Sequence, residues 1–367
     1  MLEIKATETV SEGSIFGQIC TMDHEQLVIC HDEPTGLKAL IAIHNTTLGP
    51  SLGGTRMWPY ASEAEAITDV LRLSRGMTFK NALAGLNLGG GKAVILGDPS
   101  LKSEAYLRRF GRFVQSLNGK YITAEDVNMN TSDMEYIGME TRNVTGMPET
   151  KGGGGDPSPV TAYGTYMGIK AAAKKAFGSD SLVGKKIAVQ GVGHVGRHLI
   201  DYLIKEKAQV FVTDIFEDKL KAVAKETGAH AIDPKLIYDL DMDIYSPCAL
   251  GASVNDQTIN RLKCAVIAGA ANNQLQDESK HGKILIEKGI VYAPDFLINA
   301  GGVINVAAEY FGNYNRETVY KQTEKIYDTC LSIFDKSEKE NIPVQQAAIE
   351  SAKARIESIA KVHRSFI

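Results

Sequence analysis

The spacing of hydrophobic and polar positions changes along the chain, and each change marks an expected element. Residues 37–44, LKALIAIH, are dense in apolar and β-branched side chains and follow the turn-like DEPTG, which predicts a strand after a hairpin. Ser62 and Glu65 have capping-box spacing, and the apolar stripe behind them predicts a helix reaching toward Met77. Residues 93–96 predict a strand. A further helix is expected because its apolar residues share one face: Tyr106, Phe110, Phe113, Val114 and Leu117.

The second half of the chain alternates strands and helices more regularly. Gly and Pro crowd together in 146–159, GMPETKGGGGDPSP, where we expect an interdomain hinge. The pattern beyond it predicts helix 159–176, strand 186–190, helix 195–206, strand 208–213, helix 217–227, strands near 243–246 and 264–268, and charged helices from about 316 onward. This alternation predicts a parallel sheet covered on both faces.

Composition narrows the class of protein. A chain of 367 residues exceeds the size of most single cores, so two domains are expected. The net charge of −4 gives no reason to expect nucleic acid or an anionic membrane as a partner. The N-terminal MLEIKATETV does not resemble a secretory signal, and no apolar run is long enough to span a bilayer. Five widely spaced cysteines without a CxxC motif favour reduced thiols in a cytoplasmic protein.

A glycine-rich loop carries the first chemical signal. The strand 186–190 runs into Gly191-x-Gly193-x-x-Gly196, and a helix pattern follows, so His194 and Val195 are also expected to contact a dinucleotide. The helix N-terminus supplies backbone donors for phosphates.

An acidic residue ends the next strand of this Rossmann-type pattern. Asp214 lies 18 residues after the third glycine, where its carboxylate would accept hydrogen bonds from the adenosine ribose and repel a 2′-phosphate. NAD is therefore preferred over NADP. The i, i+4 pair His194 and His198 has no companion carboxylate at metal-binding spacing, and we expect no metal.

The segment 76–99, GMTFKNALAGLNLGGGKAVILGDP, is the candidate catalytic region. Lys80 lies at the far end of a predicted helix, and Lys92 follows three glycines in what looks like a turn. A lysine acts as a general base only if its pKa is lowered, which burial beside a second cation achieves. Asp126 ends a short strand, ITAEDVN, where it could orient Lys92 or carry a proton. Glu125 is the alternative, and strand alternation points the two acids apart.

These segments resemble the glutamate/leucine/phenylalanine/valine dehydrogenase family, and most closely its leucine-using branch. The similarity covers essentially the whole chain. It rests on segments that occur in the family order: LGGTRM, MTFKNALAGLN, LNLGGGKAVILGDP, NGKYITAEDVN, PSPVTAYG, AVQGVGHVG, CALG, AGAANNQL and INAGGVINV.

The resemblance implies roles for individual residues. Lys80 is similar to the lysine that binds the substrate α-carboxylate, and Lys92 to the lysine that acts as acid and base. Asp126 is similar to the second catalytic acid. The resemblance also implies that the nicotinamide end and the substrate carboxylate are held by Thr161, Asn272 and Asn273.

The resemblance further implies an apolar side-chain pocket. Leu52, beside Gly53 and Gly54, stands where the glutamate-using branch carries a lysine, so an acidic substrate would bury an unpaired charge. The other implied walls are Met77, Ala124, Val303 and Val306. All are apolar, which suits leucine, valine or isoleucine.

The fold class expected is α/β with two domains. Residues 1–147 form a substrate-binding, catalytic and oligomerisation domain on which the C-terminal helices, about 343–367, pack back, and residues 148–342 form a Rossmann-type, doubly wound NAD-binding domain. Substrate is expected in a cleft between them. The resemblance implies a homo-oligomer, an octamer.

The expected reaction is the NAD-dependent, reversible oxidative deamination of leucine and other branched-chain L-amino acids to 2-oxo acids and ammonia. Valine or phenylalanine dehydrogenase is the alternative within the family, because one methylene is worth only about 1–3 kcal/mol. A 2-hydroxy-acid dehydrogenase would need a His–Asp pair with an Arg near the cofactor loop, and none is found there. A non-catalytic NAD-binding sensor is disfavoured because Lys92 and Asp126 are both present.

Overall fold

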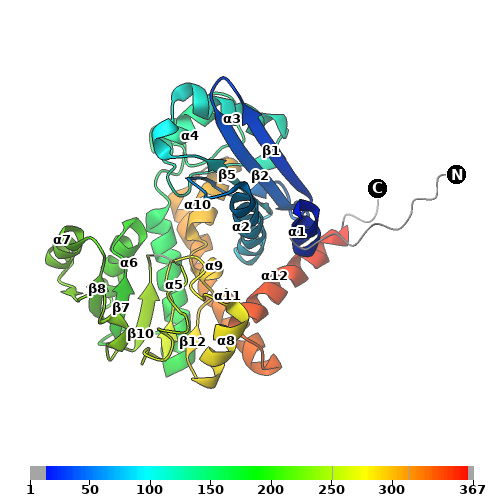
Figure 1. The fold of residues 1–367 in the computed structure, drawn as a ribbon. Helices are drawn as coiled ribbons and strands as arrows, with labels where there is room; N and C mark the ends of the chain where they lie inside the picture. Colours follow the sequence, from blue (N-terminus) through cyan, green and yellow to red (C-terminus); the bar gives the residue numbers. More distant parts are fainter. Residues whose placement is uncertain (1–13, 250, 313, 363–367) are drawn as a thin grey trace. The chain divides into compact units, whose positions relative to one another are not determined.

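The computed structural model describes residues 14–249, 251–312 and 314–362 (Figure 1). The chain divides into two compact units. Unit 1 holds the described residues up to Ala82, Asn87–Gly155 and those from Ile359 onward, and unit 2 holds Leu83–Leu86 and Asp156–Ser358. The N-terminal segment MLEIKATETV and residues 363–367 lie outside the described residues.

Unit 1 is built around a mixed six-stranded sheet in the order β1-β2-β5-β3-β6, with β4 also paired to β5. Strands β1 and β2 form the predicted antiparallel hairpin, and β2 is antiparallel to β5, whereas β3 and β4 are parallel to β5. Its elements are α1 (Ile15–Met22), β1 (Gln26–Asp32), β2 (Leu37–Asn45), β3 (Ser51–Leu52), β4 (Thr55–Trp58), α2 (Glu63–Leu83), β5 (Gly89–Leu96), α3 (Glu104–Ser116), β6 (Tyr121–Ile122) and α4 (Thr131–Gly138).

Alternating side chains give this sheet two buried faces. Ile41 and Ile95 pack with Phe110 of α3 in one core, whereas Leu40 and Val94 pack with α2 in another. Helices α3 and α4 therefore cover one face and α2 the other, as Figure 1 shows. The predicted apolar face of α3 is confirmed.

Strand β5 begins earlier than the sequence indicated. The three glycines before Lys92 were expected to form a turn, but they are the first residues of the strand, so that expectation is wrong. Crowding explains their presence in a strand. A Cβ on Gly90 would lie 2.1 Å from the Thr78 nitrogen, and one on Gly91 would lie 2.8 Å from the Ser51 hydroxyl.

Unit 2 holds an all-parallel sheet in the order β12-β11-β10-β7-β8-β9. Numbered by chain position within the unit, this is the 3-2-1-4-5-6 order of a dinucleotide-binding fold, and it confirms the predicted doubly wound class. Its elements are α5 (Ser158–Phe177), β7 (Lys186–Gln190), α6 (His194–Lys205), β8 (Gln209–Thr213), α7 (Glu217–Thr227), β9 (His230–Ala231), β10 (Ile244–Pro247), β11 (Val266–Ile267), α8 (Glu278–Glu287), β12 (Val291–Tyr292), α9 (Asp295–Ile298), α10 (Gly301–Tyr310), α11 (Arg316–Glu340) and α12 (Val344–Ala360).

Helix α12 differs from its expected place. Residues from about 343 were expected to pack on the first domain, whereas the chain through Ser358 belongs to unit 2. The contacts explain the difference. Glu350 pairs with Lys336 of α11 at 3.2 Å, and Gln345 donates a hydrogen bond to Glu278 of α8 at 3.2 Å.

No helix among the described residues is long and apolar enough to cross a membrane. All five cysteines carry free thiols. Burial raises the pKa of Cys30 to about 11 and that of Cys264 to about 12, so these thiols stay protonated and unreactive at neutral pH.

Two buried histidines fasten α2 to its sheet face. His24 Nε2 lies 2.8 Å from the Ser74 hydroxyl and 3.0 Å from the Leu71 carbonyl oxygen, and His44 Nδ1 lies 2.8 Å from the Thr78 hydroxyl. The two imidazole rings meet edge to face, with centroids 4.7 Å apart. Burial, with Arg75 as a further cause, lowers the pKa of His24 to about 4, although the Leu71 carbonyl opposes the shift.

This histidine makes stability depend on pH. The pKa of His24 is 6.5 when unperturbed and about 4 when folded, so below pH 6.5 the unfolded chain binds a proton that the folded chain does not. Stability should fall between pH 6.5 and 4 and this loss should be complete below pH 4, at a cost of up to about 3 kcal/mol. In His24→Gln that part of the fall should disappear, as measured by guanidinium unfolding at pH 7 and pH 5 and equal protein concentration.

The exposed His31 on β1 supplies the matched control. His31→Gln should keep the wild-type difference in unfolding free energy between the two pH values. If His24→Gln also keeps the whole difference, the assigned role of His24 in the pH dependence is wrong.

Candidate active site

Lys92 lies on the α2 face of the unit 1 sheet. Its Cα pairs with Ala42 of β2, and it is two residues from Val94, which packs in the core beneath α2. Only 7% of its side chain is exposed. Its ammonium nitrogen lies 2.8 Å from Oδ2 of Asp126, so the buried charge has a direct partner.

Glycines make room for this pair. A Cβ on Gly53 would lie 1.8 Å from the Gly91 carbonyl oxygen, and one on Gly54 would lie 3.0 Å from Cβ of Asp126. Gly90 meets the backbone of α2 at Thr78, as described above. Glycine at these positions therefore lets three backbone segments approach closely around Lys92.

Asp126 lies beyond β6, in a segment that runs beside β4. Thr55 of β4 pairs with Glu125, and the Met57 nitrogen donates to the Val127 carbonyl oxygen at 3.1 Å. Burial alone would raise the pKa of Asp126, but the charges of Lys92 and Arg56 outweigh it and lower the pKa to about 2. The carboxylate is therefore ionised at neutral pH.

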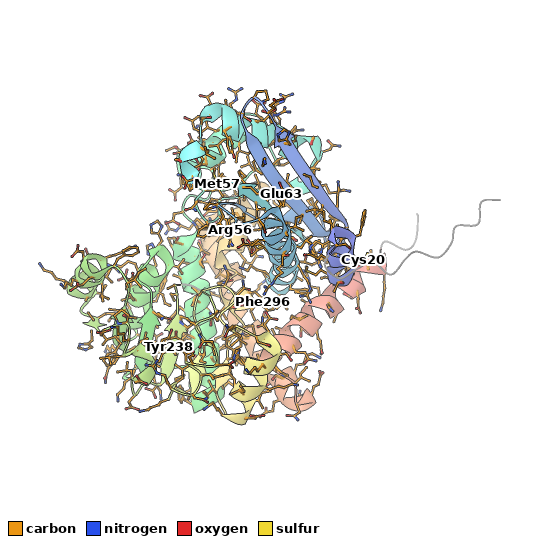
Figure 2. All side chains as sticks on the ribbon, in the orientation of Figure 1. Cys20, Arg56, Met57, Glu63, Tyr238 and Phe296 are labelled. Atoms are coloured by element: carbon orange, nitrogen blue, oxygen red, sulfur yellow. The ribbon has the colours of Figure 1, made fainter. Side chains whose placement is uncertain are left out.

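Arg56 is a member of this cluster that the sequence analysis did not single out. It lies on β4 beside Met57 (Figure 2), and its Nε donates to Oδ2 of Asp126 at 3.2 Å. Its NH1 reaches Asp69 of α2, also at 3.2 Å. The segment LGGTRM contains Arg56, but its partner Asp69 depends on how α2 packs, which no spacing in the sequence reveals.

The expected substrate-binding residues fall in both units. In unit 1, Leu52 is fully buried on β3, Met77 and Lys80 lie on α2, and Ala124 precedes Glu125 and Asp126. Met77 Cγ lies 3.2 Å from where a Cβ on Gly53 would stand, which brings Met77 next to Leu52. The other two, Val303 and Val306, are buried residues of α10 in unit 2.

The glycine loop of unit 2 has the shape that a dinucleotide requires. Gly191 has φ +106°, which favours glycine, and a Cβ on Gly196 would lie 2.1 Å from the Gly191 carbonyl oxygen. Space around Gly193 is open, because a Cβ there would have no atom within 4 Å apart from its neighbours in the chain. Gly193 also begins α6 without a side-chain cap, so the first backbone donors, at His194 and Val195, stay available to an anion.

Asp214 stabilises the glycine loop through hydrogen bonds to its backbone. Its Oδ2 accepts a hydrogen bond from the Val192 nitrogen at 2.8 Å, and its Oδ1 accepts one from the Phe216 nitrogen at 3.0 Å. A hollow of about 320 Å³ adjoins the loop, lined in part by Gly193, His194 and Lys219.

Thr161, Asn272 and Asn273 all belong to unit 2. Thr161 lies in the first turn of α5, where its hydroxyl would stand 2.6 Å from a Cβ on Gly302. Asn272 accepts a hydrogen bond from Asn299 at 2.7 Å. Asn273 is exposed, and its φ of +52° is a left-handed backbone conformation that residues other than glycine seldom adopt.

Known protein families match segments of both units. The family model described as "Glu/Leu/Phe/Val dehydrogenase, dimerisation domain" matches residues 24–143, and that described as "Glutamate/Leucine/Phenylalanine/Valine dehydrogenase" matches residues 212–364. Leucine dehydrogenase of Thermoactinomyces intermedius is 58% identical over 96% of each chain. Valine dehydrogenase of Streptomyces coelicolor is 47% identical over 91% of this chain and 92% of its own.

A solved structure is also similar. L-tryptophan dehydrogenase from Nostoc punctiforme superposes with a TM-score of 0.82 at 45% identity, covering 94% of this chain and 99% of its own. These findings favour amino-acid oxidation over the 2-hydroxy-acid and sensor hypotheses. The chain belongs to the glutamate/leucine/phenylalanine/valine dehydrogenase family and is an amino-acid dehydrogenase, a pyridine-nucleotide oxidoreductase that acts on small molecules.

Proposed function

We propose that the enzyme catalyses the NAD-dependent, reversible oxidative deamination of leucine and other branched-chain L-amino acids, giving 2-oxo acids and ammonia. One observation carries the proposal: Lys92 is buried and lies 2.8 Å from Asp126, within a family of amino-acid dehydrogenases. A lysine and a carboxylate in contact supply the base and the charged partner that proton transfer at an amino-bearing carbon requires.

The choice of a branched-chain substrate rests on Leu52. Its side chain is fully buried, and Met77 packs close to the glycine that follows it. A substrate carboxylate placed against these apolar side chains would lose its hydration without gaining a counter-ion. The chain is 58% identical to the leucine dehydrogenase and 47% identical to the valine dehydrogenase, which favours leucine as the substrate. Oxidation of valine or phenylalanine is the alternative.

Unit 1 can hold the substrate and handle its protons. We assign Lys80 to the substrate α-carboxylate, and Lys92 in its neutral form to accepting a proton from the substrate. Lys92 releases that proton to solvent. Water then attacks the iminium formed on the substrate while Lys92 takes the water proton, and Asp126 stabilises the ammonium form of Lys92. Lys92 gives this proton to the amino nitrogen of the substrate and accepts the hydroxyl proton as ammonia departs. Departure of ammonia leaves the 2-oxo acid, and the reverse sequence returns the amino acid.

Unit 2 provides residues that fit a dinucleotide. The uncapped start of α6, the open space at Gly193 and the contact between Gly191 and Gly196 match a bound pyrophosphate. When bound, NAD accepts the hydride from the substrate Cα. We assign Thr161 and Asn272 to the nicotinamide end, Asn273 to the substrate carboxylate, and Asp214 to the adenosine ribose.

Replacing Lys92 tests the catalytic assignment. Lys92→Ala should lower kcat for leucine oxidation by at least about 10³-fold, because both the base and the partner of Asp126 are lost. NAD affinity should change by less than about twofold, since the glycine loop is part of unit 2. Turnover is followed by NADH absorbance and cofactor affinity by calorimetry.

Lys38 on β2 supplies the control, because it is an exposed lysine of the same sheet. Lys38→Ala should behave as wild type in both assays. Turnover by Lys92→Ala within tenfold of wild type would show that Lys92 is not the base.

Replacing Asp214 tests the preference for NAD. In Asp214→Ser, the ratio of kcat/KM with NAD to that with NADP should fall by about 10- to 100-fold, because the charge that repels a 2′-phosphate is gone. The ratio is the measure of choice, since loss of the hydrogen bond to Val192 should disturb both cofactors alike. The exposed neighbour in Asp218→Asn should leave the ratio unchanged, and an unchanged ratio in Asp214→Ser would refute the assignment.

We also propose a homo-oligomer, an octamer, with unit 1 supplying subunit contacts. The family model that matches residues 24–143 is described as a dimerisation domain, and β1 is an edge strand with Ile29 largely exposed. Light scattering of the purified protein should give eight times the chain mass. A monomer mass at micromolar concentration would contradict the proposal.

We place the enzyme in the cytoplasm. Its five cysteines are free thiols, three of them buried, and such cysteines are typical of a reducing compartment.

A further inference from the structure

Arg56 connects the proposed catalytic acid to the helix that carries the proposed carboxylate-binding lysine. Its Nε donates to Asp126 and its NH1 to Asp69, each at 3.2 Å, so the planar guanidinium spans two carboxylates. Arg56 and Asp69 are both largely buried, with side chains 23% and 29% exposed. The Tyr60 hydroxyl also donates a hydrogen bond to Asp69, at 2.6 Å, and so helps to fix the Asp69 carboxylate.

The two cations that contact Asp126 converge on one oxygen. Lys92 lies 2.8 Å from Oδ2 and Arg56 Nε lies 3.2 Å from the same atom. Oδ1 accepts no hydrogen bond from any residue in the described ranges. The carboxylate is thus held by the two cations through the same oxygen.

We propose that Arg56 is a positioning residue of the reaction, which acts through Asp126 by fixing its orientation and keeping it anionic beside Lys92. The proposal rests on the function proposed above, in which Lys92 and Asp126 are the catalytic pair. Arg56 and Lys92 both contact Asp126, so the effect of Arg56 passes through the carboxylate that the two cations share. A lysine could supply the charge but not the fixed two-armed geometry.

The electrostatic environment supports this role. Three groups face Asp126 from the neighbouring strands: Lys92 on β5, Arg56 on β4 and Tyr121 on β6. Burial raises the pKa of Asp126, whereas Lys92 and Arg56 lower it to about 2. Without Arg56, burial opposes Lys92 alone, and the pKa of Asp126 should move back toward or above its ordinary 3.8.

The experiment compares Arg56→Gln and Arg56→Lys with wild type. In Arg56→Gln, kcat should fall by about 10- to 100-fold while leucine KM stays within about twofold, because the acid is misplaced rather than the substrate. The acid limb of its kcat–pH profile, measured in the direction that consumes 2-oxo acid and ammonia, should move to higher pH. In Arg56→Lys, the acid limb of the kcat–pH profile should lie closer to its wild-type position than in Arg56→Gln. Its kcat should stay below the wild-type value, since its ammonium cannot span both carboxylates.

Arg108 gives a matched control, because it also bridges two carboxylates of unit 1, Glu104 and Glu140, at 3.0 and 2.7 Å. Arg108→Gln should leave kcat and the pH profile unchanged. The proposal fails if Arg56→Gln keeps the wild-type acid limb, or if Arg56→Lys does not restore it. Should Arg56→Gln not fold, Arg56→Lys decides alone, and a wild-type kcat in it overturns the proposal.

Failure of this inference is distinct from failure of the proposed function. If Lys92→Ala is inactive and the Arg56 variants match wild type, only the role of Arg56 is wrong. If Lys92→Ala stays active, the catalytic pair itself is wrong.

Discussion

Burying an ammonium group in a sheet is costly unless a carboxylate lies against it, and unit 1 is arranged around meeting that requirement for Lys92. The partner, Asp126, must approach within hydrogen-bonding distance, which needs glycine at position 54. Helix α2 must close over the same face, which needs glycine at position 90. The glycine-rich strand, the short strands beside it and the packing of α2 can all be understood as conditions for this one ion pair.

In the proposed function, the two units carry different parts of the chemistry. Unit 1 contributes charged groups in fixed contact, where Lys92, Asp126 and Arg56 form a linked set. Unit 2 contributes backbone donors at the start of α6, where side chains are kept away by Gly193. In the proposed reaction, the titratable groups of unit 1 would transfer protons and the backbone donors of unit 2 would bind the phosphates of the cofactor.

Much of this arrangement was predictable from the sequence. The density of apolar residues identified β2, helical spacing identified α3, and the alternation of strand and helix patterns identified the elements of unit 2. The glycines before Lys92 were expected to form a turn but lie in β5. Glycine is needed in this strand because segments distant in the chain, such as Thr78, approach its backbone closely. Arg56 was missed for the same reason: its partners Asp69 and Asp126 are brought to it by tertiary packing. The place of α12 likewise depends on its contacts with α11 and α8.

The buried lysine–aspartate pair and the apolar residue at position 52 together indicate a dehydrogenase of branched-chain amino acids. The most direct measurement is the rise in NADH absorbance when purified protein and NAD are given leucine, valine, isoleucine, phenylalanine or glutamate separately at alkaline pH. The highest kcat/KM is expected with leucine or its branched neighbours. Oxidation of glutamate alone would contradict the assignment of Leu52, and no oxidation of any of the five would contradict the proposed reaction.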